Sequence, residues 1–238
     1  METITSPIPL YKQQVAVILL AMDPVQFMSG HFYLVMIAAV PFIIAGQVYL
    51  LVHKMSEPEN MFRSLPGGLD PNKQQILSGY RSWLGSNNFY SVATFQFGII
   101  QVAAFQQKDT QRFFFFNFHK RLTFCADTYF SDDISLETST SGDAGMFPHR
   151  PDKYVQSIPN IMPDEVWRRH LEAEAYLLKK FKIVEKSLSM PYEQLLLYNI
   201  RLNMQYVRSI PFYPFRALYW YAVMRGRMAN RSIQQQYP

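Results

Sequence analysis

The residues that could carry out chemistry are few and scattered. The chain has five histidines and one cysteine, Cys125, and no histidine is spaced with a second ligand as a familiar metal motif requires. A single cysteine excludes a disulfide scaffold and any zinc or iron–sulfur site built from cysteines of this chain. Cys125 lies in an apolar stretch, so we expect an inert core thiol. Asp132 and Asp133 could bind a cation, but an acidic pair in a serine-rich loop is more often solvated.

Catalytic and nucleotide-binding motifs are also missing from the sequence. Ten glycines in 238 residues leave little room for phosphate-binding loops, and no serine lies in a glycine-flanked nucleophile motif. Asn230, Arg231 and Ser232 form a glycosylation sequon, although a three-residue match is common by chance. We therefore predict a protein without enzymatic activity, cofactor or metal.

The positive charge is concentrated at the C-terminal end. The net charge is +5, and residues 194–238 contain six arginines but neither lysine nor an acidic residue. Aromatic residues are interleaved with these arginines, and guanidinium groups are weakly hydrated and stack on rings. The pattern favours a surface for acidic protein, anionic lipid such as cardiolipin, or RNA, and a solvated helical face is the alternative. The candidate interface residues are Arg201, Arg208, Arg216, Tyr219, Trp220, Arg225, Arg227 and Arg231.

Composition narrows the class of protein further. Hydrophobic residues make up 49% of the chain, aromatic residues 16% and charged residues 17%, against about 25% charged residues in a typical soluble protein. These values exclude a disordered chain, a collagen and a coiled coil.

One segment is apolar and long enough to cross a bilayer. Residues 24–53 carry no formal charge, and Gln47 is the one strongly polar side chain between Phe32 and Val52. As a helix, Phe32–Val52 would be about 31 Å long, which matches a hydrocarbon core of about 30 Å. Pro41 would kink the helix, as membrane helices tolerate. We predict a single transmembrane helix over 31–54, and a buried core helix of a soluble protein is the alternative.

The residues before this span, 1–30, are interpreted as an amphipathic lead-in at the membrane surface. Within them the apolar run Val15–Met22 is too short to span, and the hydrophobic core of a signal peptide is the alternative. Cations are more frequent just after the span than before it. The positive-inside rule therefore favours the matrix or cytoplasm for the C-terminal side.

The region after the span is predicted to contain a β-hairpin and an extended strap. Phe89–Phe105 and Arg112–Cys125 are rich in β-branched and aromatic residues and flank a short polar link, which is typical of a hairpin. A second membrane span over the first run is the alternative. The phenylalanines at 113–116 must alternate between two strand faces, so other elements or a partner must cover both. We expect a linker and this hairpin in 55–130, and an extended loop in 131–163.

The last region, 164–238, is predicted to be helical with an Arg/aromatic tail. Asp164 can cap a helix with a continuous apolar stripe, and Glu165 and Arg169 are spaced for an i,i+4 ion pair. Pro191 begins a second helix, and a short third helix precedes the polar tail. The expected fold is therefore mixed but mainly α, with a single transmembrane helix, a β-hairpin, a proline-rich strap and C-terminal helices.

Two patches resemble the SGDH accessory subunit of mitochondrial complex I. The first is His31-Phe32-Tyr33 with Pro41 eight residues later, similar to that family's aromatic-led span with an internal proline. The second runs over His149–Val155, Pro163–Trp167 and Glu172–Glu174, and resembles the family's His-Pro strap and charged helix. The resemblance implies that the helical part faces the intermembrane space, opposite to the charge rule, so the side is left open.

A separate stretch resembles cytochrome c oxidase subunit four. It comprises Ser187–Met190 with Glu193, Leu197 and Tyr198, although that family needs a membrane span further downstream and this sequence has none there. What both resemblances imply is a single-span, non-catalytic, supernumerary subunit of a mitochondrial respiratory complex.

From these resemblances we predict an accessory subunit in the mitochondrial inner membrane, of complex I first and cytochrome c oxidase next. Its partners would be neighbouring subunits, which it stabilises by burying apolar area and by complementary charge. The alternative is a membrane-tethered RNA-binding or mitoribosome-associated protein that uses the Arg-rich tail. We favour protein and lipid partners over nucleic acid.

Overall fold

The computed structural model describes residues 24–130, 133–142, 147–183 and 191–238. The chain divides into two units, residues 1–45 and residues 46–238. Helix α2, Pro24–Met55, begins in the first unit and ends in the second. The short run expected to be a membrane-surface lead-in, Val15–Met22, lies outside the described residues.

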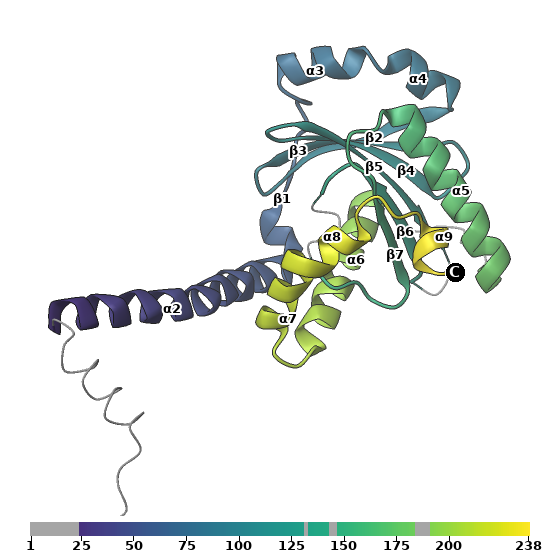
Figure 1. Ribbon diagram of the computed structural model, residues 1–238. Coiled ribbons are helices and arrows are strands. Elements are labelled where there is room, and N and C mark those ends of the chain that lie inside the picture. The colour runs from purple at the N-terminus through teal and green to yellow at the C-terminus, as the bar shows by residue number, and fades with distance from the viewer. Residues whose placement is uncertain (1–23, 131–132, 143–146, 184–190) are drawn as a thin grey trace, which may run out of the picture. The chain divides into compact units, whose positions relative to one another are not determined.

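The expectation of a mainly α fold with a single hairpin is wrong. The second unit contains a seven-stranded mixed sheet in the order β1-β2-β3-β4-β5-β6-β7 (Figure 1). Neighbouring strands are antiparallel, except that β6 and β7 are parallel. The strands are β1 (Phe62–Ser64), β2 (Phe89–Phe97), β3 (Ile100–Gln107), β4 (Arg112–Phe118), β5 (Leu122–Tyr129), β6 (Ser135–Ser139) and β7 (Lys153–Ser157).

Each run that was expected to form one strand of the hairpin folds back on itself. Phe89–Phe105 contains β2 and most of β3, joined by a tight turn in which Gly98 has a φ of +58°. Glycine adopts this left-handed conformation without a Cβ penalty, and an added Cβ would also lie 3.3 Å from Met61. Arg112–Cys125 likewise contains β4 and the start of β5. The second membrane span considered over Phe89–Phe105 is therefore wrong as well.

The region 131–163 is not the extended strap that its prolines suggested. Strands β6 and β7 lie within it and pair in parallel register from Ser135↔Lys153 to Ser139↔Ser157. Parallel strands need a crossover between them, so no local turn signal marks the pairing in the sequence. The proline-rich segment supplies that connection and the approach to the next helix.

Helices occupy most of the region expected to be helical. Helix α5 has Pro163 as its first residue and Met162 at its N-cap, so Asp164 lies in the first turn and is not the cap. The expected ion pair forms, with Arg169 Nε 2.7 Å from Glu165 Oε1. The helices after α2 are η1 (Pro58–Met61), α3 (Pro71–Ser78), α4 (Arg81–Ser86), α5 (Pro163–Phe181), α6 (Tyr192–Ser209), α7 (Tyr213–Tyr219), the π-helix η2 (Trp220–Met224), α8 (Arg225–Met228) and α9 (Ile233–Gln236).

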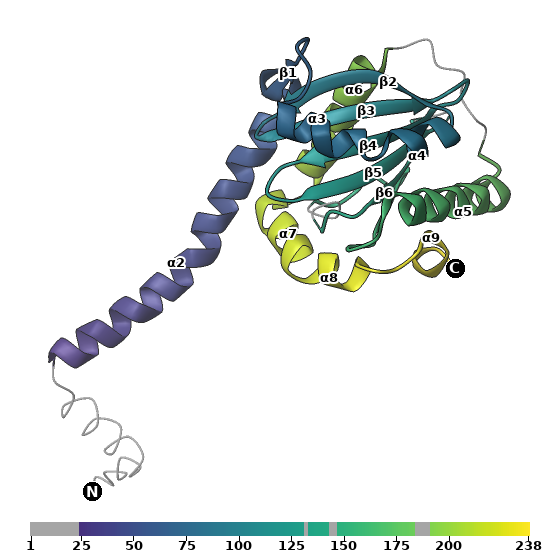
Figure 2. The same cartoon turned by 90° about the horizontal axis from the view of Figure 1, so that it is seen from above.

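Helices cover both faces of the sheet (Figures 1 and 2). The run Phe113–Phe116 contacts helices on both faces. Phe114 and Phe116 pack in a core with α4 and Trp167 of α5. The first and third rings pack in a second core with Tyr192 of α6. All four rings are 4% exposed or less, so the domain covers both strand faces without a partner.

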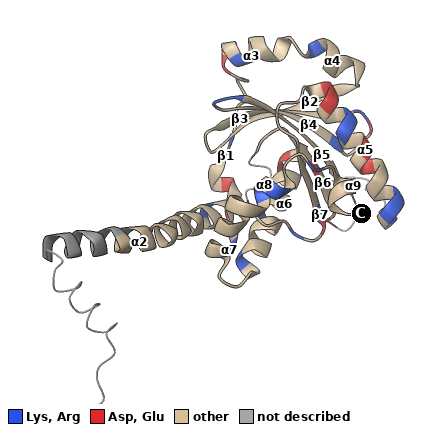
Figure 3. Cartoon of the chain, viewed as in Figure 1, with Lys and Arg blue, Asp and Glu red and all other residues tan. Residues whose placement is uncertain are grey.

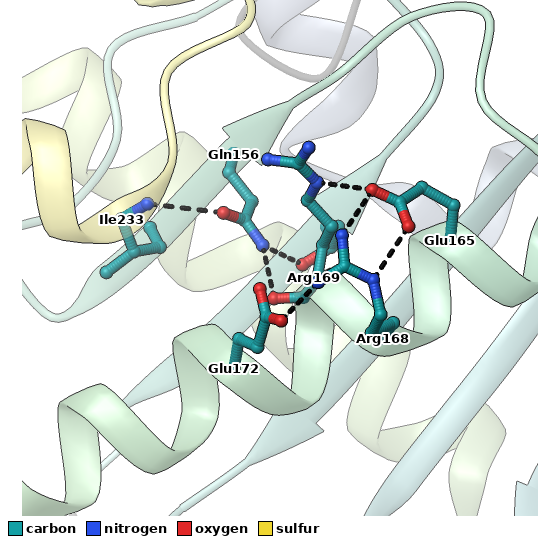
Figure 4. A network of polar contacts seen from close by, with 7 residues as sticks. Gln156, Glu165, Arg168, Arg169, Glu172 and Ile233 are labelled. Atoms are coloured by element: carbon teal, nitrogen blue, oxygen red, sulfur yellow. Dashed lines mark hydrogen bonds and ion pairs between the residues drawn. The ribbon is translucent and has the colours of Figure 1, made fainter.

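A buried hydrogen-bond network joins α5 to the sheet and to the C-terminal segment. Figure 4 shows the part of it between Gln156 and Ile233, together with the ion pairs on the outer face of α5. His170 is fully buried, with Nε2 2.8 Å from Thr128 Oγ1 and Nδ1 2.9 Å from Thr138 Oγ1. Gln156 Nε2 donates to Thr138 Oγ1 at 2.8 Å, and its Oε1 accepts from the backbone N–H of Ile233 at 3.2 Å. Because every link is buried, loss of one side chain leaves polar atoms without partners.

A charged pair extends this network by one turn of α5. Glu174 is 2% exposed and accepts from both Nε and Nη2 of Arg112 on β4, each at 2.8 Å. Removing one member of such a pair leaves a buried charge, which is strongly destabilising. The ion pairs on the outer face of α5, such as Arg168–Glu165 at 2.6 Å, are exposed and contribute little.

We predict that His170 makes the fold sensitive to acid. Burial, and then the charge of Arg112, lower the pKa of His170 to about 3 from 6.5. The unfolded chain therefore binds more protons than the folded chain between these values, so stability falls as the pH falls through this window. At pH 5 this group costs about 2 kcal/mol relative to pH 7. His170→Gln should remove this part of the pH dependence in urea unfolding experiments.

The matched control is His119→Gln, because His119 is exposed. It should keep the wild-type dependence of the unfolding free energy on pH. Identical slopes for wild type and His170→Gln between pH 7 and 5 would contradict this assignment.

Candidate functional site

The predicted C-terminal interface residues lie on several short helices and do not form one uniform surface. Arg201 hydrogen-bonds to Glu59 of η1, Trp220 packs edge-on to His149 at 5.6 Å, and Arg225 lies 4.5 Å from the ring centre of Tyr221. These three therefore have contacts within the chain. The others are exposed and lie on α6, α7, α8 and the following loop: Arg208, Arg216, Tyr219, Arg227 and Arg231.

The final turns of α2 are packed into the second unit. Val52 is fully buried and lies in a core with Val207 of α6 and Ala217 of α7. Tyr49 also stacks on Tyr213 of α7, with ring centres 6.1 Å apart. The segment expected to span the membrane therefore ends inside the folded domain, at Val52, and Gln47 is exposed just before this packed part.

The apolar side chains nearer the N-terminal end of α2 are exposed. Leu34, Val35, Ile37 and Phe42 are 65%, 65%, 68% and 68% exposed. The window Ile37–Met55 is long and apolar enough to cross a membrane, and 11% of it is buried. Within its own unit this apolar surface is uncovered. The described side chains of α2 carry no charge before Lys54 (Figure 3).

A cleft of about 690 Å³ lies between α6 and the face of the sheet opposite α5. One face of α6 forms its helical wall, since Tyr192, Leu196, Asn199 and Asn203 recur at helical spacing. The sheet wall is aromatic and aliphatic where β2, β3 and β4 contribute Phe95, Val102 and Phe115.

Charged and polar side chains line the cleft on β5, β6 and β7. Cys125, Asp127 and Tyr129 alternate along β5 and so face the same side of the sheet. Asp127 is directly opposite Glu137 on β6, and Lys153 Nζ of β7 lies 2.8 Å from Glu137 Oε2. The Cys125 thiol donates to Asp127 Oδ1 at 3.3 Å, and the Tyr129 hydroxyl donates to Oδ2 at 3.2 Å.

The charges in this cluster are not balanced. Glu137 has Lys153 as its partner, whereas among the described residues no cationic side chain forms an ion pair with Asp127. Burial, and then the charge of Glu137, raise the pKa of Asp127 to about 7. Asp127 therefore exchanges its proton near neutral pH. Burial and then the charge of Asp127 raise the pKa of Cys125, so its thiol stays protonated and is a poor nucleophile.

Other polar atoms of the cleft have no partner among the described residues. Both ring nitrogens of His149 and Oδ1 of Asn203 are buried and make no hydrogen bond there. Asn203 as a whole is 8% exposed. Burial, and then Lys153, lower the pKa of His149 to about 3, so the ring is neutral and offers one acceptor and one donor. Such atoms are costly unless a molecule in the cleft bonds to them.

These groups suit the binding of a ligand better than a covalent reaction. Within the described ranges no three His, Cys, Asp or Glu side chains are grouped as a metal site would need. Asp133, considered as half of a cation site, accepts a hydrogen bond from the Tyr198 hydroxyl at 3.2 Å, and Asp132 lies outside the described residues. The cleft is instead an apolar groove with a few convergent polar groups, as small-molecule sites are.

The prediction that Cys125 is a core thiol is confirmed, since it is 8% exposed, but sequence reasoning missed the cleft beside it. The alternation of Cys125, Asp127 and Tyr129 is a detectable signal, because a carboxylate inside an apolar strand marks a face that is not simply core. Glu137 and Lys153 join it only through the sheet register, which no local pattern reveals. Comparison with protein-family models, curated proteins and solved structures found no match to this chain.

We predict that Asp127→Asn changes the pH dependence of stability in the opposite sense to His170→Gln. The pKa of Asp127 is raised in the folded state from 3.8 to about 7, so folding takes up a proton between these values. Its contribution to stability is therefore lost as the pH rises through this window, by about 1.4 kcal/mol per pH unit. Asp127→Asn should gain stability relative to wild type between pH 5 and pH 8, as measured by urea unfolding.

Asp109→Asn is the matched control, since Asp109 is exposed in the β3–β4 turn and asparagine tolerates its φ of +59°. It should follow wild type at both pH values. A constant difference between Asp127→Asn and wild type across this range would show that Asp127 ionises normally.

Proposed function

We propose that the protein is a membrane-anchored binding protein whose cleft takes a small ligand. The observation that carries this proposal is the cleft itself. Its volume of about 690 Å³ falls within the range of about 300 to 1,000 Å³ for small-molecule sites. It also combines aromatic walls with the unpartnered polar atoms of His149 and Asn203 and the charged cluster around Asp127.

The division of α2 supports the anchor. Residues 24–45 form about 33 Å of helix before the second unit begins, close to the thickness of a hydrocarbon core. The following turns are already packed on α6 and α7. In this proposal the lipid-embedded segment is therefore 24–45, and the domain begins at the membrane surface.

An exposed aromatic and arginine surface lies where α2 enters the domain. Phe212, Phe215 and Tyr219 are 83%, 40% and 52% exposed, and Arg208 and Arg216 are exposed beside them in the chain. Tyr213 of α7 stacks on Tyr49, so this surface adjoins the part of α2 that belongs to the second unit. Aromatic rings favour the membrane interface and arginines bind anionic headgroups. We propose that this part of the predicted interface contacts anionic lipid.

The accessory-subunit function stays a prediction from the sequence resemblances, as does the mitochondrial inner membrane as its location. The exposed surface on α7 favours it as a second candidate, because the same residues could meet an acidic neighbouring subunit. The need for a partner to cover Phe113–Phe116 no longer supports it, since the domain's own helices cover these rings.

We predict that charges placed in the exposed part of α2 release the protein from membranes. Leu34 and Ile37 are 65% and 68% exposed and lie near the middle of 24–45, and each lysine at the centre of a spanning helix costs about 2.5 to 3.5 kcal/mol. The double variant Leu34→Lys with Ile37→Lys should appear in the supernatant after a carbonate wash, whereas wild type should stay in the pellet. Ile76→Lys, on exposed α3, is the control and should behave as wild type.

We predict that filling the cleft blocks small-molecule binding. Leu196→Trp places a large ring in the cleft from α6, so the full chain in nonionic detergent should bind 1-naphthol about tenfold more weakly than wild type in isothermal titration. Leu171→Trp is the control, because Leu171 is exposed on α5 and away from the cleft. Absence of saturable binding to wild type, or equal binding to Leu196→Trp, would refute the cleft as a ligand site.

A further inference from the structure

The charged cluster around Asp127 has one more carboxylate than it has cations among the described residues. Two acids, Asp127 and Glu137, and one base, Lys153, meet on adjacent strands, and Lys153 is taken by Glu137 at 2.8 Å. Asp127 receives only a thiol and a phenol hydroxyl, both neutral donors, from the described residues. A partly buried carboxylate in this position is stable either when it is protonated or when a cation joins it.

We propose that the cleft binds an organic cation, an ammonium group on an apolar body, with Asp127 as its counter-ion. This inference rests on the proposed function of the cleft and names the chemical class of its ligand. The ammonium would take the place of the proton on Asp127 and leave the Glu137–Lys153 pair intact.

The groups that face Asp127 are consistent with a cation there. On its own strand they are Cys125 and Tyr129, on β6 Glu137, and on α6 Tyr192. Lys153 on β7 is the one described cation that acts on it. Since Lys153 is paired, the surroundings of Asp127 are neutral or negative.

The aromatic wall provides a site for the apolar body. Tyr192 is the centre of this wall, with ring centres 5.5 Å from Phe115 and 6.3 Å from Phe95. An ammonium close to such rings gains cation–π attraction, which neutral and anionic head groups lack. A ligand with a short aromatic or alkyl body would therefore bury that body on α6, β2 and β4 while its charge meets β5.

A second, independent observation comes from the other wall of the cleft. Asn203 Oδ1 is a buried acceptor with no described partner in a side chain that is 8% exposed, and neutral His149 adds another acceptor nitrogen. Acceptors of this kind are satisfied by N–H donors. A ligand with N–H groups can therefore donate to Asn203 Oδ1 and to the acceptor nitrogen of His149 on this wall, and to Asp127 on the sheet.

Apart from Lys153, the basic residues that line the cleft lie away from Asp127. His119, Lys120 and Arg121 precede β5, and Asp127 follows Arg121 by six residues along that strand, or about 20 Å. The two ends of the cleft therefore differ in charge. This polarity predicts that the ammonium binds at the Asp127 end only.

The test compares three probes that share a phenyl body and differ in the charge of the head group. Phenethylamine, 2-phenylethanol and 3-phenylpropionate are titrated calorimetrically into the full chain in nonionic detergent at pH 7. Wild type should bind phenethylamine about tenfold more tightly than 2-phenylethanol and should not prefer 3-phenylpropionate. Because Asp127 titrates near this pH, binding should also release a proton, which repeats in phosphate and Tris buffers will detect.

Asp127→Asn should lose both the preference for phenethylamine and the proton release, whereas Asp109→Asn should keep both. Equal binding of the three probes, or a preference for 3-phenylpropionate, would overturn the proposal that the ligand is an organic cation. Binding of 1-naphthol would then still support the cleft as a ligand site. Absence of binding by all three probes and by 1-naphthol would overturn the proposed function as well. In nanodiscs, competition with phenethylamine by phosphatidylethanolamine but not by phosphatidylcholine would identify a lipid amine as the natural source of the ammonium group. Absence of this competition would identify a free amine.

Discussion

The fold depends on one constraint: the central strands are apolar on both faces, so both faces must be covered. Phe114 and Phe116 face α4 and α5, while Phe113 and Phe115 face α6. Burial of an aromatic side chain stabilises a domain by about 1.5 to 3 kcal/mol, so neither face can be left to water. The two covers differ in kind. Helix α5 is tied to the sheet by buried hydrogen bonds from His170 and an ion pair from Glu174, whereas α6 packs closely at Tyr192 and leaves the cleft beside it.

The sequence predicts local elements well and their pairing poorly. The apolar stripe and acidic first turn of α5, the start of α6 at Pro191 and the charge-free helix at 24–53 are local signals, and the structure contains all three elements. The four-strand meander was read as one hairpin because Gly98 was the only turn signal inside the first run. The β6–β7 pairing was missed because its two halves are joined by a proline-rich crossover that resembles a loop.

The same difference between local signals and strand pairing explains which parts of the site can be predicted from the sequence. The arginines and aromatic residues after position 194 stand out by composition, yet the structure divides them between internal contacts, as for Arg201 and Trp220, and exposed positions, as for Arg216. The acidic cluster is invisible by composition, because Asp127, Glu137 and Lys153 are ordinary charges in sequence and become unusual only when three strands place them side by side.

The most direct test of this account is the ionisation of Asp127 itself, followed by the ¹³C chemical shift of its side-chain carboxyl during a pH titration. The free protein should give a pKa of about 7, because burial and Glu137 oppose the negative charge. With saturating phenethylamine the account predicts a value lowered by about two units, since a bound ammonium favours the carboxylate. The same pKa with and without phenethylamine would contradict it.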